Sequence, residues 1–253
     1  MTKNNKWLAI CILPSLALLA GCGKKESTEE QPAATPAATT SSIDPATAAT
    51  ISGTVKYDGP APKGAKIDMS QDPNCAGSNT AENVVVADGN LANVFVYVKE
   101  GLGNRTFPVP TEAVTLAQVG CKYNPHVLGV MAGQTIKIVN GDPTTHNIHP
   151  TPKDNREWNE SQPPQSAPLA KSFAREETLL PVKCNQHPWM KMYINVVRNP
   201  FYAVTGADGK FEIKGLPPGD YTLAFVHEKL GEKDEKVTLA AKDNKTVDET
   251  FKQ

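Results

Sequence analysis

Three side chains that can bind a metal ion lie within the run KCNQHPWMKMY. Cys184, His187 and Met190 are each separated by two residues, so one short loop can present a thiolate, an imidazole and a thioether together. Soft sulfur ligands stabilise Cu(I), and imidazole suits both oxidation states of copper. The spacing therefore predicts three donors of a mononuclear copper site, which still needs a second imidazole.

The second imidazole is expected from His146, in the segment GDPTTHNIHP. This histidine directly follows an expected strand at residues 135–140. Two imidazoles and a thiolate in a plane, with a weak thioether above it, make up an electron-transfer copper centre. His126 and His149 are not expected to be ligands. His149 lies three residues after His146, a spacing that turns it to the other side of a strand.

These residues resemble the ligand pattern of the cupredoxins, in particular the amicyanin type, over about residues 112–198. In that family the ligand loop has the same two-residue gaps, and the first histidine is also followed by Asn. The resemblance implies a Greek-key β-sandwich that holds one copper ion, and it implies that Asn147 ties the first-histidine loop to the cysteine loop. The implied copper ligands are His146, Cys184, His187 and Met190. The sequence departs from the family at residues 180–183, where Leu-Pro-Val-Lys replaces a frequent aromatic residue.

Rival chemistries fit the same residues less well. Structural zinc prefers four Cys or His ligands and has no use for Met190. A binuclear copper centre needs a second cysteine in the loop, and the haem motif Cys-x-x-Cys-His is absent from the sequence. Catalytic Cys and His residues normally come from separate segments and need a third group that orients them. The sequence therefore predicts a carrier or binding protein and not an enzyme.

Short runs of alternating apolar residues, separated by Gly, Pro, Asn and Asp, predict an all-β fold from residue 51 onward. Val94–Val98 and 136–139 are expected to be strands with one well-buried face. Two further strands are expected to turn one apolar set inward: Leu180, Val182 and Cys184, then Met192, Ile194 and Val196. Residues 185–191 consequently fall in the connection between two strands.

Two other runs resemble carboxypeptidase regulatory-like domains, which are small transthyretin-type β-sandwiches. These are TGADGKFEIKGLPPGDYTL near the C-terminus and ISGTVKYDGPAP near residue 51. We therefore expect residues 50–108 and 199–253 to form one such sandwich, with a cupredoxin domain at 109–198 inserted in it. The alternative is two adjacent sandwiches in simple succession.

The first 21 residues are typical of a lipoprotein signal peptide, with Lys3 and Lys6 before an apolar stretch. The ending Leu-Ala-Gly-Cys22 resembles the bacterial lipobox, which implies a lipid on Cys22 and a position in the cell envelope, on the periplasmic face. Gly23 favours the outer membrane. The alternative is an ordinary signal peptide that leaves Cys22 as a free thiol. Residues 22–49 have almost no large apolar side chains and are expected to form a disordered tether.

Cys75, Cys121 and Cys184 remain once the signal peptide and the lipid-bearing cysteine are set aside. An odd number of cysteines in an oxidising compartment indicates one disulfide and one cysteine with another task. We predict a disulfide between Cys75 and Cys121, which leaves Cys184 for the metal. The main alternative places Cys121 with His126 in a second metal site.

Bulk composition is that of a soluble globular protein, with 253 residues, 39% apolar and 21% charged residues. The formal net charge of −1 gives no reason to expect nucleic acid as a partner. The expected function is single-electron transfer by one copper ion, with Pro188 and Trp189 contacting a redox partner such as a c-type cytochrome or a dehydrogenase. Copper storage or delivery is an alternative. A glycan- or protein-binding envelope lipoprotein with a secondary copper site is another.

Overall fold

The computed structural model describes residues 43–75, 77 and 79–252. In this part of the chain it contains twenty-one β-strands, one 3-10 turn and no α-helix, which confirms the predicted all-β fold class. No helix among the described residues is long and apolar enough to span a membrane. The predicted signal peptide, Cys22 and the tether up to residue 42 lie outside the described residues.

Strands from both ends of the described chain share two sheets, which we call the split sheet pair. The first sheet consists of β1 (Ala49–Asp58), β4 (Val86–Ala87), β5 (Asn90–Leu91), β17 (Lys210–Leu216), β20 (Asn244–Thr246) and β21 (Glu249–Lys252). The second consists of β6 (Phe95–Glu100), β16 (Tyr202–Val204), β18 (Gly219–His227) and β19 (Gly231–Leu239).

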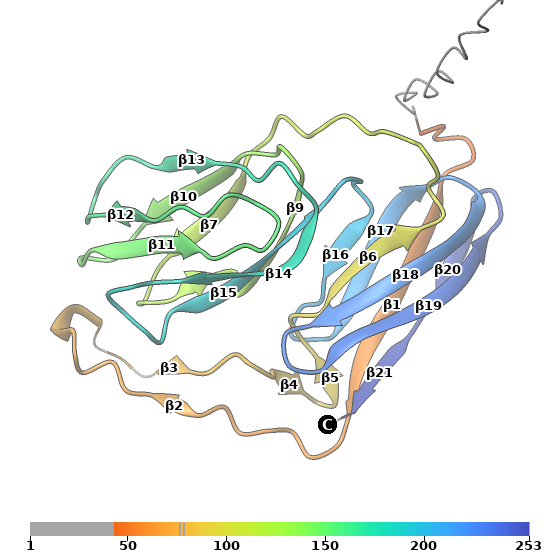
Figure 1. Ribbon diagram of the computed structural model, residues 1–253. Coiled ribbons are helices and arrows are strands. Elements are labelled where there is room, and N and C mark those ends of the chain that lie inside the picture. The colour runs from red at the N-terminus through yellow and green to blue at the C-terminus, as the bar shows by residue number, and fades with distance from the viewer. Residues whose placement is uncertain (1–42, 76, 78, 253) are drawn as a thin grey trace, which may run out of the picture. The chain divides into compact units, whose positions relative to one another are not determined.

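Strand β1 organises the first of these sheets. It pairs antiparallel with β17 and parallel with β20 and β21, so Figure 1 shows the orange strand running beside blue ones. Gly53 permits this close approach, because a Cβ atom there would lie 1.8 Å from the carbonyl oxygen of Val247. The two sheets enclose one apolar core, to which Ile51, Phe211 and Phe225 contribute.

The chain between these halves forms two other sheets, which we call the inserted sheet pair. The first consists of β7 (Val114–Gln118), β8 (Tyr123–Asn124), β10 (Ile136–Asn140) and β13 (Leu169–Lys171). The second consists of β9 (Val127–Met131), β11 (His146–Pro150), β12 (Glu160–Gln162), β14 (Glu177–Lys183) and β15 (Lys191–Val197). Their common core includes Leu180, Val182 and Cys184, together with Met192, Ile194 and Val196. These two apolar sets point inward, as predicted from alternation.

Strand β6 differs from its prediction, because both of its faces are buried. Val96 and Val98 pack in the core of the split sheet pair, while Phe95 and Tyr97 belong to a separate cluster with Val197 of the inserted pair. Alternation alone indicated one buried face. The second face is buried by residues distant in sequence, which a local pattern does not reveal.

Residues 66–80 also depart from the predicted domain boundaries. This segment holds β2 (Lys66–Ile67), the 3-10 turn η1 (Pro73–Cys75) and β3 (Asn79–Thr80). It precedes β4 in the chain, yet Met69 and Cys75 pack in the core of the inserted sheet pair. The consequence is that a segment assigned to the other sandwich reaches the ligand loop.

Residues 43–49, which were assigned to the tether, have defined contacts. Ile43 packs against the core of the split sheet pair, and Asp44 closes a turn by accepting a hydrogen bond from the backbone of Ala46 at 2.9 Å. Strand β1 then starts at Ala49, which is buried. This turn was not predicted, because residues 43–49 have a low apolar content. The turn is stabilised by hydrogen bonds of one Asp and the backbone, which apolar content does not reveal.

Candidate metal centre

The loop between β14 and β15 carries the three closely spaced candidates. Lys183 and Lys191 are paired across the two strands, which brings both ends of the loop together. Inside it the backbone N–H of Met190 donates to the carbonyl of His187 at 2.9 Å, and that of Cys184 donates to the carbonyl of Met190 at 3.2 Å. These bonds fold residues 184–190 into a compact turn. Pro181 does not interrupt β14. Its side chain is exposed, and the residues on either side of it keep their pairing with β15.

His146 is the first residue of β11, at the end of a loop that follows β10. Asn140 shapes this loop by donating its side-chain amide to the carbonyl of Thr144 at 2.8 Å and accepting the backbone N–H of Asp142 at 2.9 Å. Strand β11 then pairs with β14 at Pro150. The fold thus sets the first histidine beside the cysteine loop.

Three of the four predicted ligands converge. The Nδ1 atoms of His146 and His187 lie 2.9 Å apart, and the Sγ of Cys184 lies 3.7 Å from the Nδ1 of His187. One donor atom from each residue lies within 4.8 Å of the other two, and all three residues are buried. Met190 is fully buried in the same core cluster as Cys184, at the end of the loop. Cys184 is a free cysteine.

Asn147 contacts the cysteine loop through its backbone. Its N–H donates to the Sγ of Cys184 at 3.2 Å, while its side-chain amide donates to Asn159 at 3.1 Å. Its carbonyl accepts a hydrogen bond from the hydroxyl of Tyr123. The role that the family resemblance implied for this residue is therefore available to its main chain, and the Asn side chain points elsewhere.

Two carboxylates that the sequence analysis missed hold the outer edges of the histidine rings. Asp142 Oδ2 lies 2.9 Å from the Nε2 of His146, and Asp72 Oδ2 lies 3.0 Å from the Nε2 of His187. Asp142 precedes His146 by four residues, a local signal that could have been noticed. Asp72 lies 115 positions before His187, so no local pattern pointed to it.

Burial favours the neutral form of His146, and hydrogen bonds favour the charged form of Asp72. Burial lowers the pKa of His146, an effect that outweighs the opposing one of the Asp142 carboxylate. A hydrogen bond from the hydroxyl of Thr144, at 2.6 Å, is the main reason that the pKa of Asp72 lies well below its usual range, followed by the backbone N–H of Asn74. Neutral imidazole is the form that binds metal ions.

The expected partner-contact residues are partly covered. Pro188 is exposed, but Trp189 is half-buried, and its indole N–H donates to the carbonyl of Cys121 at 3.1 Å. The Trp189 ring packs against His187 with centroids 5.1 Å apart. His187 itself is only 3% exposed because Asp72 covers its outer edge.

The remaining candidates lie apart from this cluster. Cys75 and Cys121 form a disulfide, so Cys121 does not share a second metal site with His126. His126 lies 2.5 Å from Glu228. His149 contacts Asn185 at 2.9 Å and Glu157 at 2.7 Å through its two ring nitrogens.

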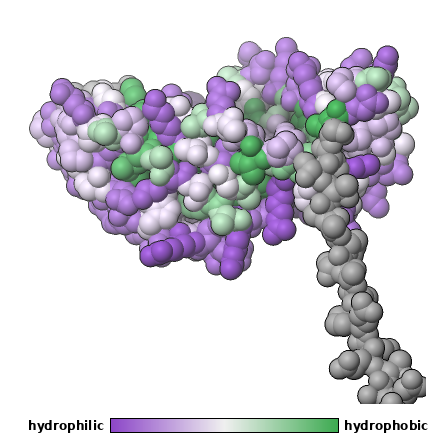
Figure 2. Space-filling view, turned by 90° about the horizontal axis from the view of Figure 1, so that it is seen from above, coloured by the Kyte–Doolittle hydropathy of each residue, from purple (hydrophilic) through white to green (hydrophobic). Residues whose placement is uncertain are grey.

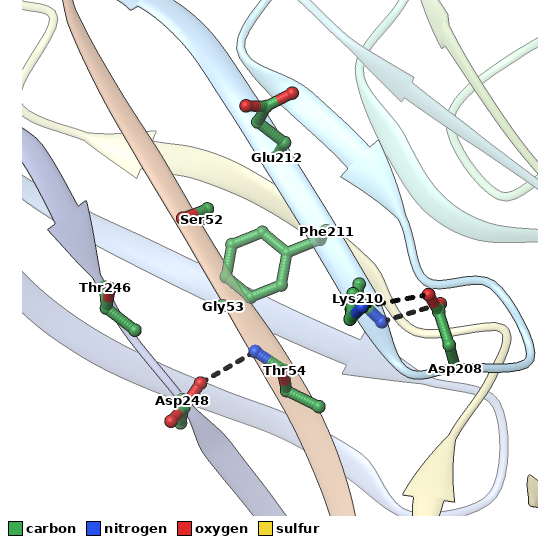
Figure 3. Close-up of a pocket in the computed structure, with 9 residues that line it drawn as sticks. All are labelled: Ser52, Gly53, Thr54, Asp208, Lys210, Phe211, Glu212, Thr246 and Asp248. Atoms are coloured by element: carbon green, nitrogen blue, oxygen red, sulfur yellow. Dashed lines mark hydrogen bonds and ion pairs between the residues drawn. The ribbon is translucent and has the colours of Figure 1, made fainter.

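A hollow with a volume of about 660 Å³ lies on the split sheet pair. Figure 3 shows partners for two of its three carboxylates: Asp248 accepts the backbone N–H of Thr54 at 2.8 Å, and Asp208 faces Lys210. The third, Glu212, pairs with Lys214 at 2.8 Å. Phe211, an aromatic residue in its lining, is 5% exposed and offers no open face for stacking on a sugar. This hollow carries no ligand assignment.

No family model matches the chain, and no curated protein matches it. Among solved structures, the chain is similar to a Cu-containing nitrite reductase from Thermus scotoductus SA-01, at 20% identity over 36% of this chain and 24% of that one, with a TM-score of 0.33. It is similar to a purple cupredoxin from Nitrosopumilus maritimus, at 19% identity over 33% and 98%, with a TM-score of 0.29. A Cu(I) amicyanin variant matches at 22% identity over 35% and 85%, with a TM-score of 0.30. The chain thus spans about a quarter of the nitrite reductase.

Proposed function

We propose that the chain is a copper protein of the cupredoxin type that carries single electrons. The proposed ligands of its one copper ion are His146, Cys184, His187 and Met190. This proposal depends on the donor atoms themselves and on the direction in which the two imidazole rings face.

The placement of the two histidine rings, with a carboxylate at each Nε2 and the Nδ1 atoms facing each other, is the observation that supports this function most directly. Asp142 and Asp72 can only accept hydrogen bonds when ionised, so each requires the proton on the Nε2 of its histidine. A neutral ring protonated at Nε2 presents a bare lone pair at Nδ1. Two such lone pairs face each other at 2.9 Å, next to the Sγ of Cys184, in a buried space. A cation between them is the natural complement of this arrangement.

The donor types favour copper over zinc. One thiolate with two imidazoles and a nearby thioether is the set expected for electron-transfer copper, whereas structural zinc takes four Cys or His ligands. Copper would supply a one-electron couple at this site. All four proposed donors belong to the protein and leave no coordination position for a substrate, so we propose a carrier and not an enzyme.

The chain's own groups would hold the donors in place. The backbone N–H of Asn147 donates to the Sγ of Cys184 and fixes its direction. The carboxylates of Asp142 and Asp72 keep the two rings from rotating. Because the three converging residues are buried, bulk water is kept from the donor atoms.

We propose a redox protein, such as a c-type cytochrome or a dehydrogenase, as the partner, and Pro188 with Trp189 as part of the contact. Among the described residues, the large hydrophobic side chains that are exposed are Val109 and Val119. On the face seen in Figure 2, apolar residues occur in separate groups among polar ones. Such a surface suits brief encounters of small area, which are typical of redox partners.

We also propose that Cys22 carries a lipid and anchors the protein on the periplasmic face of the cell envelope, in the outer membrane. The support is the sequence Leu-Ala-Gly-Cys22 after a basic and then apolar segment. Metabolic labelling with a fatty acid would test this, because wild-type protein should take up the label and Cys22→Ala should not.

Reversible redox cycling would separate electron transfer from copper delivery. We expect one equivalent of copper per chain, an intense thiolate-to-copper absorption band after oxidation, and complete bleaching and recovery over repeated cycles. A colourless protein that holds only Cu(I) and passes it to an acceptor would instead favour copper delivery. A protein that binds no copper would contradict both functions.

A further inference from the structure

The disulfide Cys75–Cys121 lies close to both candidate copper histidines. The Sγ of Cys75 lies within 4.8 Å of a carboxylate oxygen of Asp72 and a ring nitrogen of His187. The Sγ of Cys121 likewise lies within 4.8 Å of a carboxylate oxygen of Asp142 and a ring nitrogen of His146. Each half of the disulfide therefore sits beside one histidine–carboxylate pair.

Hydrogen bonds from the cysteine backbone connect each aspartate to its half of the disulfide. Asp142 accepts the N–H of Cys121 at 2.8 Å and that of Gly120 at 2.7 Å. On the other side the N–H of Cys75 donates to the carbonyl of Asp72 at 2.9 Å, within the η1 turn. Cys121 thus binds the Asp142 carboxylate directly, whereas Cys75 binds the main chain of Asp72, so the position of each aspartate depends on the position of a cysteine.

Asp72 has the greater need of this link. It lies in the 66–80 segment, whose paired strands β2 and β3 are only two residues long each. Met69 and Cys75 are the buried residues that attach this segment to the inserted sheet pair. The disulfide to Cys121 is the covalent part of that attachment, and it closes a sequence separation of 46 residues. The disulfide therefore limits how far Asp72 can move from His187.

We propose that Asp72 and Asp142 are positioning residues for the copper histidines, and that the disulfide Cys75–Cys121 couples copper retention to thiol–disulfide chemistry. Reduction of the disulfide weakens copper binding, and bound copper protects the disulfide to the same degree. A dithiol reductant would supply two electrons and two protons, the sulfur–sulfur bond would break into two thiols, and the reductant would close to its own disulfide. The copper ion keeps its oxidation state in this step. The inference rests on the proposed copper function.

Competition for Cu(I) with a chromophoric chelator tests the positioning role on the full chain. We expect Asp72→Asn to lose about 10- to 100-fold in copper affinity, as is usual when the partner of a ligating histidine is removed. The double variant Cys75→Ser/Cys121→Ser should lose a similar factor. Combining both changes should cost less than the product of the two factors, because the same contact is lost twice.

Asp248→Asn is the matched control. Asp248 also accepts a backbone hydrogen bond, at 2.8 Å from Thr54, but lies in the hollow of the split sheet pair. We expect its copper affinity to stay within about twofold of wild type. If the folded double cysteine variant also stays within that limit, the coupling is wrong. If the copper affinity of Asp72→Asn stays within that limit, Asp72 does not position His187.

The reverse measurement uses wild-type protein, with Cys184→Ser as its control. A phosphine reductant is added to apo and Cu(I)-loaded protein, and alkylation at Cys75 and Cys121 is followed by peptide mass mapping. Both cysteines are buried, so the reductant reaches them only after local opening, and bound copper lowers the population of the open state. We therefore expect copper to lengthen the half-time of reduction at least about tenfold, and to have no effect in Cys184→Ser. Equal half-times with and without copper in wild type would overturn the coupling. Failure of wild type to bind copper would instead overturn the proposed function.

Discussion

The histidines His146 and His187 differ from His126 and His227 in what surrounds their ring nitrogens. In the first pair both Nε2 atoms meet carboxylates, and both Nδ1 atoms converge near a thiol. In the second region His126 meets Glu228, while the Nδ1 of His227 accepts backbone N–H groups of the following turn at 3.2 and 3.3 Å. All four residues are buried.

This comparison shows that burial of a histidine does not by itself make a metal centre. Among the described residues, the Nε2 of His227 is buried without a hydrogen-bond partner, and the groups of histidine, cysteine and acidic side chains that could hold a metal do not include His126 or His227. The distinguishing features are converging lone pairs and a soft sulfur donor, fixed by carboxylates on the far side of each ring.

The largest effect is expected from removing a histidine of the converging pair. His187→Ala should lower copper affinity by more than about 100-fold, because loss of a ligand exceeds the loss of its hydrogen-bond partner. His126→Ala should leave copper affinity unchanged. Chelator competition measures both variants, and equal losses would remove the distinction between the two regions.

The pH dependence of the free energy of unfolding should report on His227 in the second region. Burial lowers the pKa of His227 to about 4, with nearby Glu228 acting in the opposite direction and His126 in the same one. In the unfolded chain His227 binds a proton near pH 6.5, whereas in the folded protein it does so only near pH 4. Stability should therefore fall as pH drops through this window, by about 3 kcal/mol.

Urea unfolding of apo protein at several pH values between 7 and 4 measures this effect. His227→Leu should flatten the fall relative to wild type, since it removes the group that the unfolded state protonates. An unchanged slope in the variant would show that other groups govern the pH dependence.

A smaller effect is expected at Glu228, whose side chain is 3% exposed. Glu228→Gln weakens its contact with His126 and should lower the free energy of unfolding by about 2 kcal/mol at pH 7, as for a hydrogen bond to a charged group. Copper affinity should not change. A loss of copper in this variant would mean that the two histidine regions communicate.

The smallest effect on copper is expected from Trp189→Ala. The indole packs on His187 without offering a donor to the metal, so affinity should stay within about threefold. Electron exchange with a redox partner should slow by about fivefold, equivalent to about 1 kcal/mol of lost contact. Stopped-flow exchange and chelator competition on the same sample compare these quantities, and a larger loss in affinity than in exchange would contradict the contact role.

Local patterns predicted what depends on neighbours in sequence. Alternation indicated the inward sets of β14 and β15, and the two-residue gaps indicated a loop that presents Cys184 and His187. The contact of Asp72 with His187 was not predictable, because it depends on how a segment 115 positions away packs. The second buried face of β6 was missed for the same reason. The Asn147 link was expected from the family resemblance and is made by its backbone N–H, which every residue except proline carries.

Visible and electron paramagnetic resonance spectra of Cu(II)-loaded wild type and Cys184→Ser test the copper–thiolate centre most directly. We expect an intense thiolate-to-copper band and a narrow copper hyperfine splitting in wild type, and the loss of both in the variant, since serine offers no thiolate. Identical spectra would contradict the proposed centre.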